Sequence, residues 1–257
     1  MNQPVISAAE LAEIAATVTH SVGVEVGRRR TEGFSWTTKS TSTDVVTEID
    51  TWAEQAVVEQ LLAERPDDGF LGEEGTQRDG TTGVVWVIDP VDGTTNLLYG
   101  LAGFSVSIGV EVDGVPTAGA VFDPVRDELF VASIGNGATR NGEPIAPTKL
   151  DELSSALVAT GFSYSGDDRL HQAKALVTIL PKVRDIRRNG GAALDFCAVA
   201  SGRVDAYFER GIQHWDGAAG RVIAAEAGAV VEMDAMTLVA TPGIADALRA
   251  LLQQASA

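Results

Sequence analysis

The first quarter of the chain carries apolar residues at the spacing of amphipathic helices. Within residues 11–18 apolar side chains recur every three to four positions, which places them on one helix face. Ser7 followed by Glu10 is a capping-box signature, and the pattern predicts a helix from there to about Arg29. A second pattern of the same kind predicts a helix over residues 47–65.

Strand patterns follow these helices. The run 84–89 is apolar up to its last residue, as expected of a buried strand. We expect this strand to break at Pro90, because proline cannot donate to a ladder. Residues 103–140 hold alternating runs, and Asp113 with Gly114 between two of them is a strong hairpin signal. This region is therefore predicted to be an antiparallel meander.

The second half of the chain alternates short β runs with helical ones, which predicts an α/β layer arrangement. We expect strands at 156–160, 204–208 and 229–233 and helices at 192–202, 216–228 and 243–254. A boundary near residues 144–151 divides the chain into an N-terminal α+β part, 1–148, and a C-terminal α/β part, 149–257.

Composition narrows the function. The chain has 257 residues and a formal net charge of −17, so we expect neither nucleic acid nor an anionic membrane as a partner, since both require basic surface. Cys197 is the single cysteine, which excludes an internal disulfide and thiolate metal clusters. The start lacks a basic region followed by an apolar run, and no apolar stretch is long enough to span a bilayer. We therefore expect a cytoplasmic protein.

Candidate chemistry is densest in residues 86–96, WVIDPVDGTTN. A buried strand delivers Asp89, and Asp92 follows three residues later, with the carbonyl of Val91 between them. Two buried like charges are costly unless one is protonated or a cation lies between them, and Mg²⁺ prefers oxygen ligands. Residues 93–96 are then predicted to open a helix, whose free N–H groups suit a phosphate. An Asp-rich turn that caps a short helix explains the same residues without function.

Five further acids fit the same picture less specifically. Glu73 and Glu74 follow a short apolar run and could equally form a solvated loop. Asp216 could serve the site or cap a helix. Asp44 and Asp50 could reach the same cation, or be a turn residue and a first-turn helix acid.

Together and in this order, these motifs resemble the inositol monophosphatase family of metal-dependent, lithium-sensitive phosphatases. The resemblance covers roughly residues 8–230 and is carried by segments 39–50, 72–74, 89–94 and 215–216. It implies a layered αβαβα sandwich like that of fructose-1,6-bisphosphatase. It also implies a homodimer and a site between the two halves of the chain.

The resemblance implies two to three Mg²⁺ ions. The first would be held by Glu73, Asp89 and the Val91 carbonyl, and the second by Asp89, Asp92 and Asp216. A third, weaker ion would use Glu73 and water. These ligands are all oxygen atoms, which is the set that Mg²⁺ prefers.

The resemblance also assigns roles in hydrolysis. Glu73 and Thr94 would orient and deprotonate a water for in-line attack, supported by Asp44. The main-chain N–H groups of Gly93 and Thr94 would hold the phosphate. No covalent intermediate is required.

The implied reaction is the hydrolysis of myo-inositol monophosphate to inositol and phosphate. Asp92, Gly190, Gly191, Ala192 and Glu209 would meet the ring hydroxyls. The glycines could instead serve tight packing at a helix start. Residues 97–103 depart from the family pattern, because they lack its usual aromatic residue and proline.

Rival substrates remain open at this point. Fructose 1,6-bisphosphate would need a basic partner for its second phosphate, and Arg187, Arg188 and Arg210 are candidates. Histidinol phosphate could place its amine against Glu209. A catalytically silent interaction protein is an alternative from another class.

Overall fold

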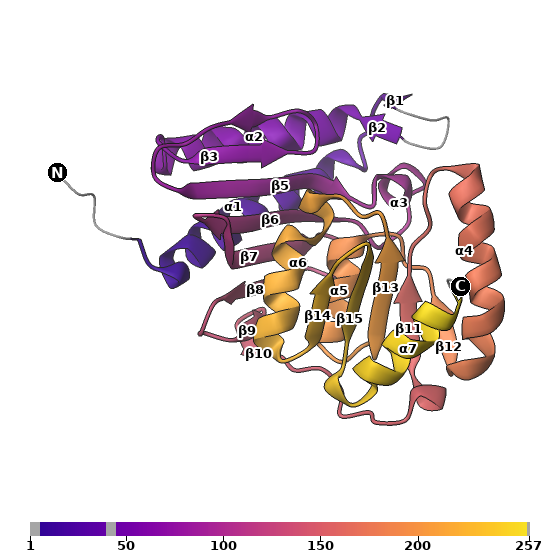
Figure 1. The fold of residues 1–257 in the computed structure, drawn as a ribbon. Helices are drawn as coiled ribbons and strands as arrows, with labels where there is room; N and C mark the ends of the chain where they lie inside the picture. The colour runs from indigo at the N-terminus through magenta and orange to yellow at the C-terminus, as the bar shows by residue number, and fades with distance from the viewer. Residues whose placement is uncertain (1–5, 40–44, 256–257) are drawn as a thin grey trace.

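The computed structural model describes residues 6–39 and 45–255 (Figure 1). Asp44 lies outside these residues. The longer helices are α1 (Ala8–Arg29), α2 (Glu48–Glu64), α3 (Thr94–Leu98), α4 (Gly166–Ile179), α5 (Ala192–Ala200), α6 (His214–Ala227) and α7 (Ala245–Ala255). None of the described helices is both long and apolar enough to cross a bilayer.

The strands form two large sheets and one small one. A short ribbon pairs β1 (Trp36–Thr38) with β2 (Val45–Thr47). The eight-stranded sheet has the order β10-β9-β8-β7-β6-β5-β3-β4, and the five-stranded sheet has the order β12-β11-β13-β15-β14. The first of these contains β3 (Gly69–Gly72), β4 (Gln77–Arg78), β5 (Val84–Asp92), β6 (Ser105–Val112), β7 (Val115–Asp123), β8 (Glu128–Ser133), β9 (Ala138–Arg140) and β10 (Glu143–Pro144). The second contains β11 (Leu157–Thr160), β12 (Asp185–Arg187), β13 (Ala206–Arg210), β14 (Val230–Met233) and β15 (Met236–Ala240).

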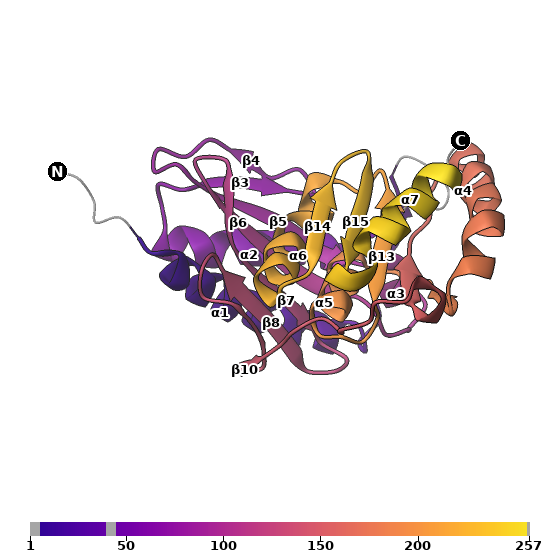
Figure 2. The ribbon, with the colours of Figure 1, turned by 60° about the horizontal axis from the view of Figure 1, so that its bottom comes forward.

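Helices and sheets alternate in five layers (Figures 1 and 2). Helices α1 and α2 pack on one face of the eight-stranded sheet, and α5 and α6 lie between the two sheets. Helices α4 and α7 pack together on the far side of the five-stranded sheet. The αβαβα sandwich implied by the family resemblance is confirmed.

The N-terminal helices begin where the sequence predicts. Ser7 and Glu10 form the expected capping box of α1, whose buried side includes Leu11 and Val18. Thr47 caps α2, and its hydroxyl accepts hydrogen bonds from the first turn. The cap satisfies N–H groups that have no partner inside the helix.

The meander is also confirmed, with one correction at its start. Asp113 (φ 51°) and Gly114 (φ 77°) form the two-residue turn between β6 and β7, and positive φ at both positions is typical of a type I′ hairpin. The expectation that the preceding strand breaks at Pro90 is wrong, because β5 continues to Asp92. Its ladder with β6 is irregular between Asp89 and Asp92, and proline is tolerated at a bulge.

The second half contains elements that the sequence pattern missed. Helix α4 buries only Ile179, so its sequence carries little amphipathic signal. Strands β12 and β15 were not expected either, and β15 completes the central part of the five-stranded sheet. The predicted boundary at 148 falls between the last strand of one sheet and the first strand of the other. Whether the two parts are separate domains stays a prediction.

Candidate active site

One pocket of about 1240 Å³ lies between the two sheets' loops and α4. Its lining includes every described residue to which the family resemblance assigns a role. These are Glu73, Asp89, Val91, Asp92, Gly93, Thr94, Gly190, Gly191, Ala192, Glu209 and Asp216. The structure therefore brings together residues from both halves of the chain, and their roles stay predictions at this point.

The end of β5 supplies the two central carboxylates. Asp89 is 2% exposed and Asp92 is 8% exposed, although both line the pocket. Burial raises the pKa of Asp89 well above its usual range, and the charges of Glu73, Asp92 and Asp216 raise it further. Burial and the charge of Asp216 do the same to the pKa of Asp92. Negative charge is thus concentrated in a region with little solvent to screen it.

Asp92 also holds the second half of the chain. Its carboxylate accepts hydrogen bonds from Ala192 N (3.1 Å) and Ala193 N (2.8 Å), at the beginning of α5. These bonds lower its pKa and partly offset the effect of burial. A carboxylate at a helix N-terminus is also favoured by the helix dipole. The side chain therefore fixes the position of the 190–192 loop.

Glu73 reaches the pocket from the neighbouring parallel strand. Strand β3 pairs with β5 so that Gly72 lies opposite Ile88, and the next residues along the two strands are Glu73 and Asp89. Glu73 N also donates to Ile88 O (3.1 Å). The carboxyl ends of parallel strands meet at one sheet edge, which explains why these two acids are adjacent.

Lys39 lies against this acidic edge. Its Nζ is 2.9 Å from Glu73 Oε1 and 2.6 Å from Glu74 Oε1. Burial alone would lower the pKa of Lys39, but the charges and hydrogen bonds of Glu73 and Glu74 raise it above its usual value. Burial raises the pKa of Glu74 to about 7, while Lys39 acts in the opposite direction. The ammonium thus partly neutralises the cluster.

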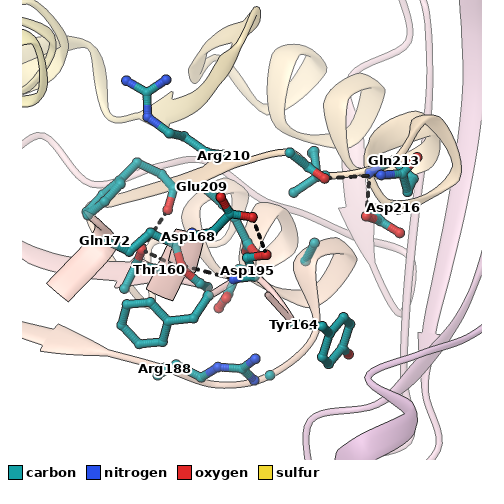
Figure 3. A pocket seen from close by; sticks show the side chains of 18 of the residues that line it. Thr160, Tyr164, Asp168, Gln172, Arg188, Asp195, Glu209, Arg210, Gln213 and Asp216 are labelled. Carbon is teal, nitrogen blue, oxygen red and sulfur yellow. Dashed lines mark hydrogen bonds between the residues drawn. The ribbon is translucent and has the colours of Figure 1, made fainter. Parts of the chain in front are cut away.

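Asp216 comes from the first turn of α6. It does not occupy the N-cap position considered for it, because α6 begins at His214 and Gln213 is the N-cap. The Asp216 carboxylate accepts a hydrogen bond from Gln213 N (2.7 Å), as Figure 3 shows. Burial raises the pKa of Asp216 to about 7, and the charges of Glu73 and Glu209 add to the effect.

Asp50 makes a contact with Thr94 that the sequence did not predict. Thr94 Oγ1 lies 2.9 Å from Asp50 Oδ1 and 3.0 Å from the carbonyl of Val91. The other carboxylate oxygen of Asp50 accepts from Thr47 N (3.0 Å). Asp44, expected to support the attacking water together with Thr94, lies outside the described residues; within them, the acid that contacts Thr94 is Asp50. The available signal was the T-x-x-D spacing, which looks like an ordinary helix start.

The opposite wall carries a second pair of acids, Asp195 and Glu209 (Figure 3). Glu209 Oε2 accepts a hydrogen bond from Tyr207 Oη (2.7 Å), and Asp195 Oδ1 accepts one from Asn189 Nδ2 (2.6 Å). Burial raises the pKa of both carboxyls, that of Asp195 to about 7. Arg188 lowers both values. Asp195 was not predicted, because an acid in a helical apolar run looks like a surface position.

The turn between the two walls is held by Asn96. Gly93 is the N-cap of α3, so its N–H and that of Thr94 lie at the start of this helix. Asn96 Nδ2 donates to Gly103 O (2.8 Å) and to Asn189 O (2.7 Å). One side chain therefore joins the α3 turn to the loop that precedes α5.

The donor set suits a hard cation. Four carboxylates and the Val91 carbonyl line one side of the pocket, and burial together with mutual repulsion raises the pKa of three of the four. A bound cation relieves both effects, and oxygen ligands favour Mg²⁺ over softer metals. Within the described ranges, no three acidic, histidine or cysteine side chains are already arranged to close around one ion.

Comparison with known proteins supports the family resemblance noted in the sequence. A sequence profile of the inositol monophosphatase family matches residues 1–252. The chain is 42% identical to the inositol-1-monophosphatase SuhB of Mycobacterium tuberculosis strain H37Rv, over 99% of this chain and 97% of that protein. It is 40% identical to the Nus factor SuhB of Escherichia coli strain K12, over 74% of this chain and 72% of that protein.

A solved structure agrees with these sequence matches. The fold superposes on Mycobacterium tuberculosis SuhB with a TM-score of 0.86 and 43% identity, covering 97% of this chain and 98% of the other. The chain belongs to the inositol monophosphatase family and is a phosphomonoesterase.

Proposed function

We propose that the chain hydrolyses inositol monophosphate, a small phosphorylated polyol, in a reaction that depends on Mg²⁺. The family is generally metal-dependent, and relatives at 42% identity carry the name inositol-1-monophosphatase. The observation that carries the proposal is the meeting of Glu73, Asp89, Asp92 and Asp216 in one pocket with the Asp50–Thr94 pair.

Two to three Mg²⁺ ions would be held by Glu73, Asp89, the Val91 carbonyl, Asp92 and Asp216. When bound, Mg²⁺ neutralises phosphate charge and lowers the pKa of a coordinated water. The Val91 carbonyl oxygen lies 3.0 Å from Thr94 Oγ1, and a carbonyl oxygen has two lone pairs, so it can still bind an ion. Lys39, now in contact with Glu73, would have to give up that contact.

The chain's own residues would handle the attacking water. A threonine hydroxyl has one proton, and Thr94 can donate it to Asp50, which leaves its lone pairs to accept a hydrogen bond from water. Glu73, on the facing edge, would then act as the general base. The N–H groups of Gly93 and Thr94 would bind the phosphate oxygens. We keep Asp44 as a further support of this water.

Recognition of the polyol would fall to the opposite wall. The carboxylates of Asp92 and Glu209 accept hydrogen bonds from hydroxyl groups, and Gly190 and Gly191 bring main chain to the pocket without side chains. Ala192 lines the pocket as well, but its N–H donates to Asp92 in this structure. We therefore expect its contact with substrate to be mainly steric.

Other substrates are less well supported. Arg187 donates to Asp185, its neighbour on β12, and does not line the pocket, whereas Arg188 and Arg210 do. The relatives named above are inositol-1-monophosphatases and Nus factors, and no sugar bisphosphatase or histidinol phosphatase is among them. These matches likewise do not favour a catalytically silent interaction protein.

Partners and location complete the proposal. The Nus factor name belongs to the Escherichia coli relative, and the net charge of −17 on this chain disfavours direct contact with nucleic acid. We propose a homodimer in the cytoplasm, without a membrane partner and with activity that is sensitive to lithium.

A phosphate-release panel tests the proposal. The substrates are inositol 1-phosphate, fructose 1,6-bisphosphate, histidinol phosphate and adenosine 3′,5′-bisphosphate, each with Mg²⁺, with Mg²⁺ plus Li⁺, and with a chelator. We expect the highest kcat/KM on inositol 1-phosphate, with loss of activity in the chelator and inhibition by Li⁺. Equal rates in the chelator would contradict the metal dependence, and a higher kcat/KM on another substrate would replace the proposed one.

A further inference from the structure

Behind the acidic edge lies a buried acid that does not face the pocket. Glu54, on α2, is 3% exposed. Its Oε2 accepts a hydrogen bond from Glu74 N (2.7 Å), and its Oε1 accepts one from Thr76 N (2.9 Å). Both oxygens therefore bind main chain of the loop that carries Glu73. A buried carboxylate bound in this way is costly to leave without its partners.

The loop is shaped around this carboxylate. A Cβ on Gly72 would lie 2.3 Å from Glu54 Oε2, so only glycine leaves room for the side chain. Gly72 N donates to Thr76 O (2.7 Å), which closes the loop. Residues 72–76 thus form a tight turn that has the Glu54 carboxylate on its inner side.

We propose that Glu54 is a positioning residue: it holds the main chain of the 72–76 loop so that Glu73 faces Asp89 and can bind a divalent cation. This inference rests on the proposed metal-dependent function. Lys39 cannot replace it, because its ammonium binds the side chains of Glu73 and Glu74, which can rotate, whereas Glu54 binds the main chain.

The arrangement predicts a specific defect. Without Glu54, Glu73 keeps its side chain but loses the fixed main chain beneath it. The cost falls on metal binding, because a ligand that must be ordered at the moment of binding lowers affinity. Once the ion is bound, the loop is ordered, so substrate affinity at saturating metal changes little.

The test measures cation binding directly, in addition to activity. The full chain and its E54A and E54Q variants are titrated with MgCl₂ and MnCl₂ in a calorimeter, at a temperature where circular dichroism shows each to be folded. We expect Kd to rise about 10-fold or more in E54A, the range for partners of metal ligands. E54Q keeps one acceptor oxygen and should rise less. KM for inositol 1-phosphate at saturating Mg²⁺ should stay within about twofold.

Asp68 provides a matched control. It is also buried, and it binds Arg65, Thr82 and Trp86 away from the pocket. D68N should lower stability without raising the Kd for Mg²⁺. An equal rise in Kd in D68N would assign the effect to general loosening and overturn the inference. Equal Kd values in wild type and E54A would also overturn it.

A second variant keeps the inference testable if E54A does not fold. Gly72→Ala retains Glu54 but places a methyl group against its carboxylate, which must then move. We expect the same rise in Kd, and an unchanged Kd would overturn the inference. If the wild-type chain itself shows no binding of Mg²⁺ or Mn²⁺, the proposed function fails, and this inference fails with it.

Discussion

The acids of the first sheet and those of the second half reach the pocket by different routes. Glu73 follows β3 directly and Asp89 lies near the carboxyl end of the adjacent parallel strand β5, so the sheet alone places them side by side. Asp216 comes from the start of α6, in the helix layer between the sheets, and Glu209 comes from β13 in the second sheet. One group is fixed by local pairing, whereas the other depends on how the layers pack.

The two groups are joined by a few polar contacts between residues 93 to 101 positions apart in the sequence. Asp92 accepts from Ala193 N, and Asn96 donates to Asn189 O. The first contact ends on the first turn of α5, and the second ends on the loop that leads into this helix. The comparison teaches that the proposed chemistry lies mainly on the first sheet, while recognition depends on contacts across the layers. Damage to either part should therefore have a different kinetic signature.

Asp89→Asn should have the largest effect. Loss of several kcal/mol of charge stabilisation corresponds to about a thousandfold in kcat/KM. The fold should persist, because a neutral amide removes a buried charge that is repelled by its neighbours. Phosphate release and urea unfolding of the metal-free protein measure both quantities.

Asp123→Asn is the control for this variant, since Asp123 is buried but binds a turn outside the pocket. It should lose stability and keep kcat/KM. If D89N retained wild-type activity in Mg²⁺, the acids of the first sheet would not carry the chemistry. The proposed division between chemistry on the first sheet and recognition across the layers would then be wrong.

Thr94→Val should have the next largest effect. It removes the hydroxyl that bridges Asp50 and the Val91 carbonyl. We expect kcat to fall about 100-fold, the usual scale for general acid–base groups, with KM nearly unchanged. Steady-state kinetics on T95V, at the adjacent threonine, gives the control. A rise in KM with constant kcat would show that Thr94 acts in substrate recognition and not in the chemical step.

The sequence predicted the acids of the first sheet better than those of the second half of the chain, for physical reasons. Short-range patterns predict that Asp89 and Asp92 lie near the carboxyl end of a buried strand, and they also predict the Asp113-Gly114 hairpin. The strand continued through Pro90 because a bulge there tolerates proline, and periodicity does not encode bulges.

Long-range contacts account for most of what was missed. Asn96 and Asn189 are 93 residues apart, and no local pattern pairs them. Asp50 could be read either as an acid that reaches the cation or as a first-turn helix acid, and its contact with Thr94 across 44 residues is visible only in the fold. Helix α4 buries too little of its surface to show a clear period.

Asn96→Asp tests the contacts that join the α3 turn to the loop that precedes α5. The carboxylate cannot donate to Gly103 O or Asn189 O, and it repels both carbonyls. We expect KM to rise about 10-fold, with a smaller fall in kcat and a loss of about 1–3 kcal/mol in the free energy of unfolding. Asn141→Asp, in a turn outside the pocket, is the control. A fall in kcat with constant KM would show that the contacts of Asn96 support the chemical step instead of substrate recognition.

Asp195→Asn should have the smallest effect on catalysis and a distinct effect on stability. Burial raises the pKa of Asp195 to about 7 in the folded chain, with Glu209 adding to the shift while Asn189 and Arg188 oppose it; the value in the unfolded chain is near 3.8. Below about pH 4 both states hold the proton. Between there and pH 7 the folded state binds more protons, so the free energy of unfolding falls as pH rises, by at most about 1.4 kcal/mol per pH unit.

D195N lacks this contribution, whereas Glu209 remains in both proteins. Urea unfolding at several pH values should therefore show the advantage of D195N growing from pH 4.5 to 7.5, with kcat within about threefold of wild type. If the difference in the free energy of unfolding between D195N and wild type did not depend on pH, the pKa of Asp195 would not be raised in the folded chain. Burying this acid would then have no cost in stability.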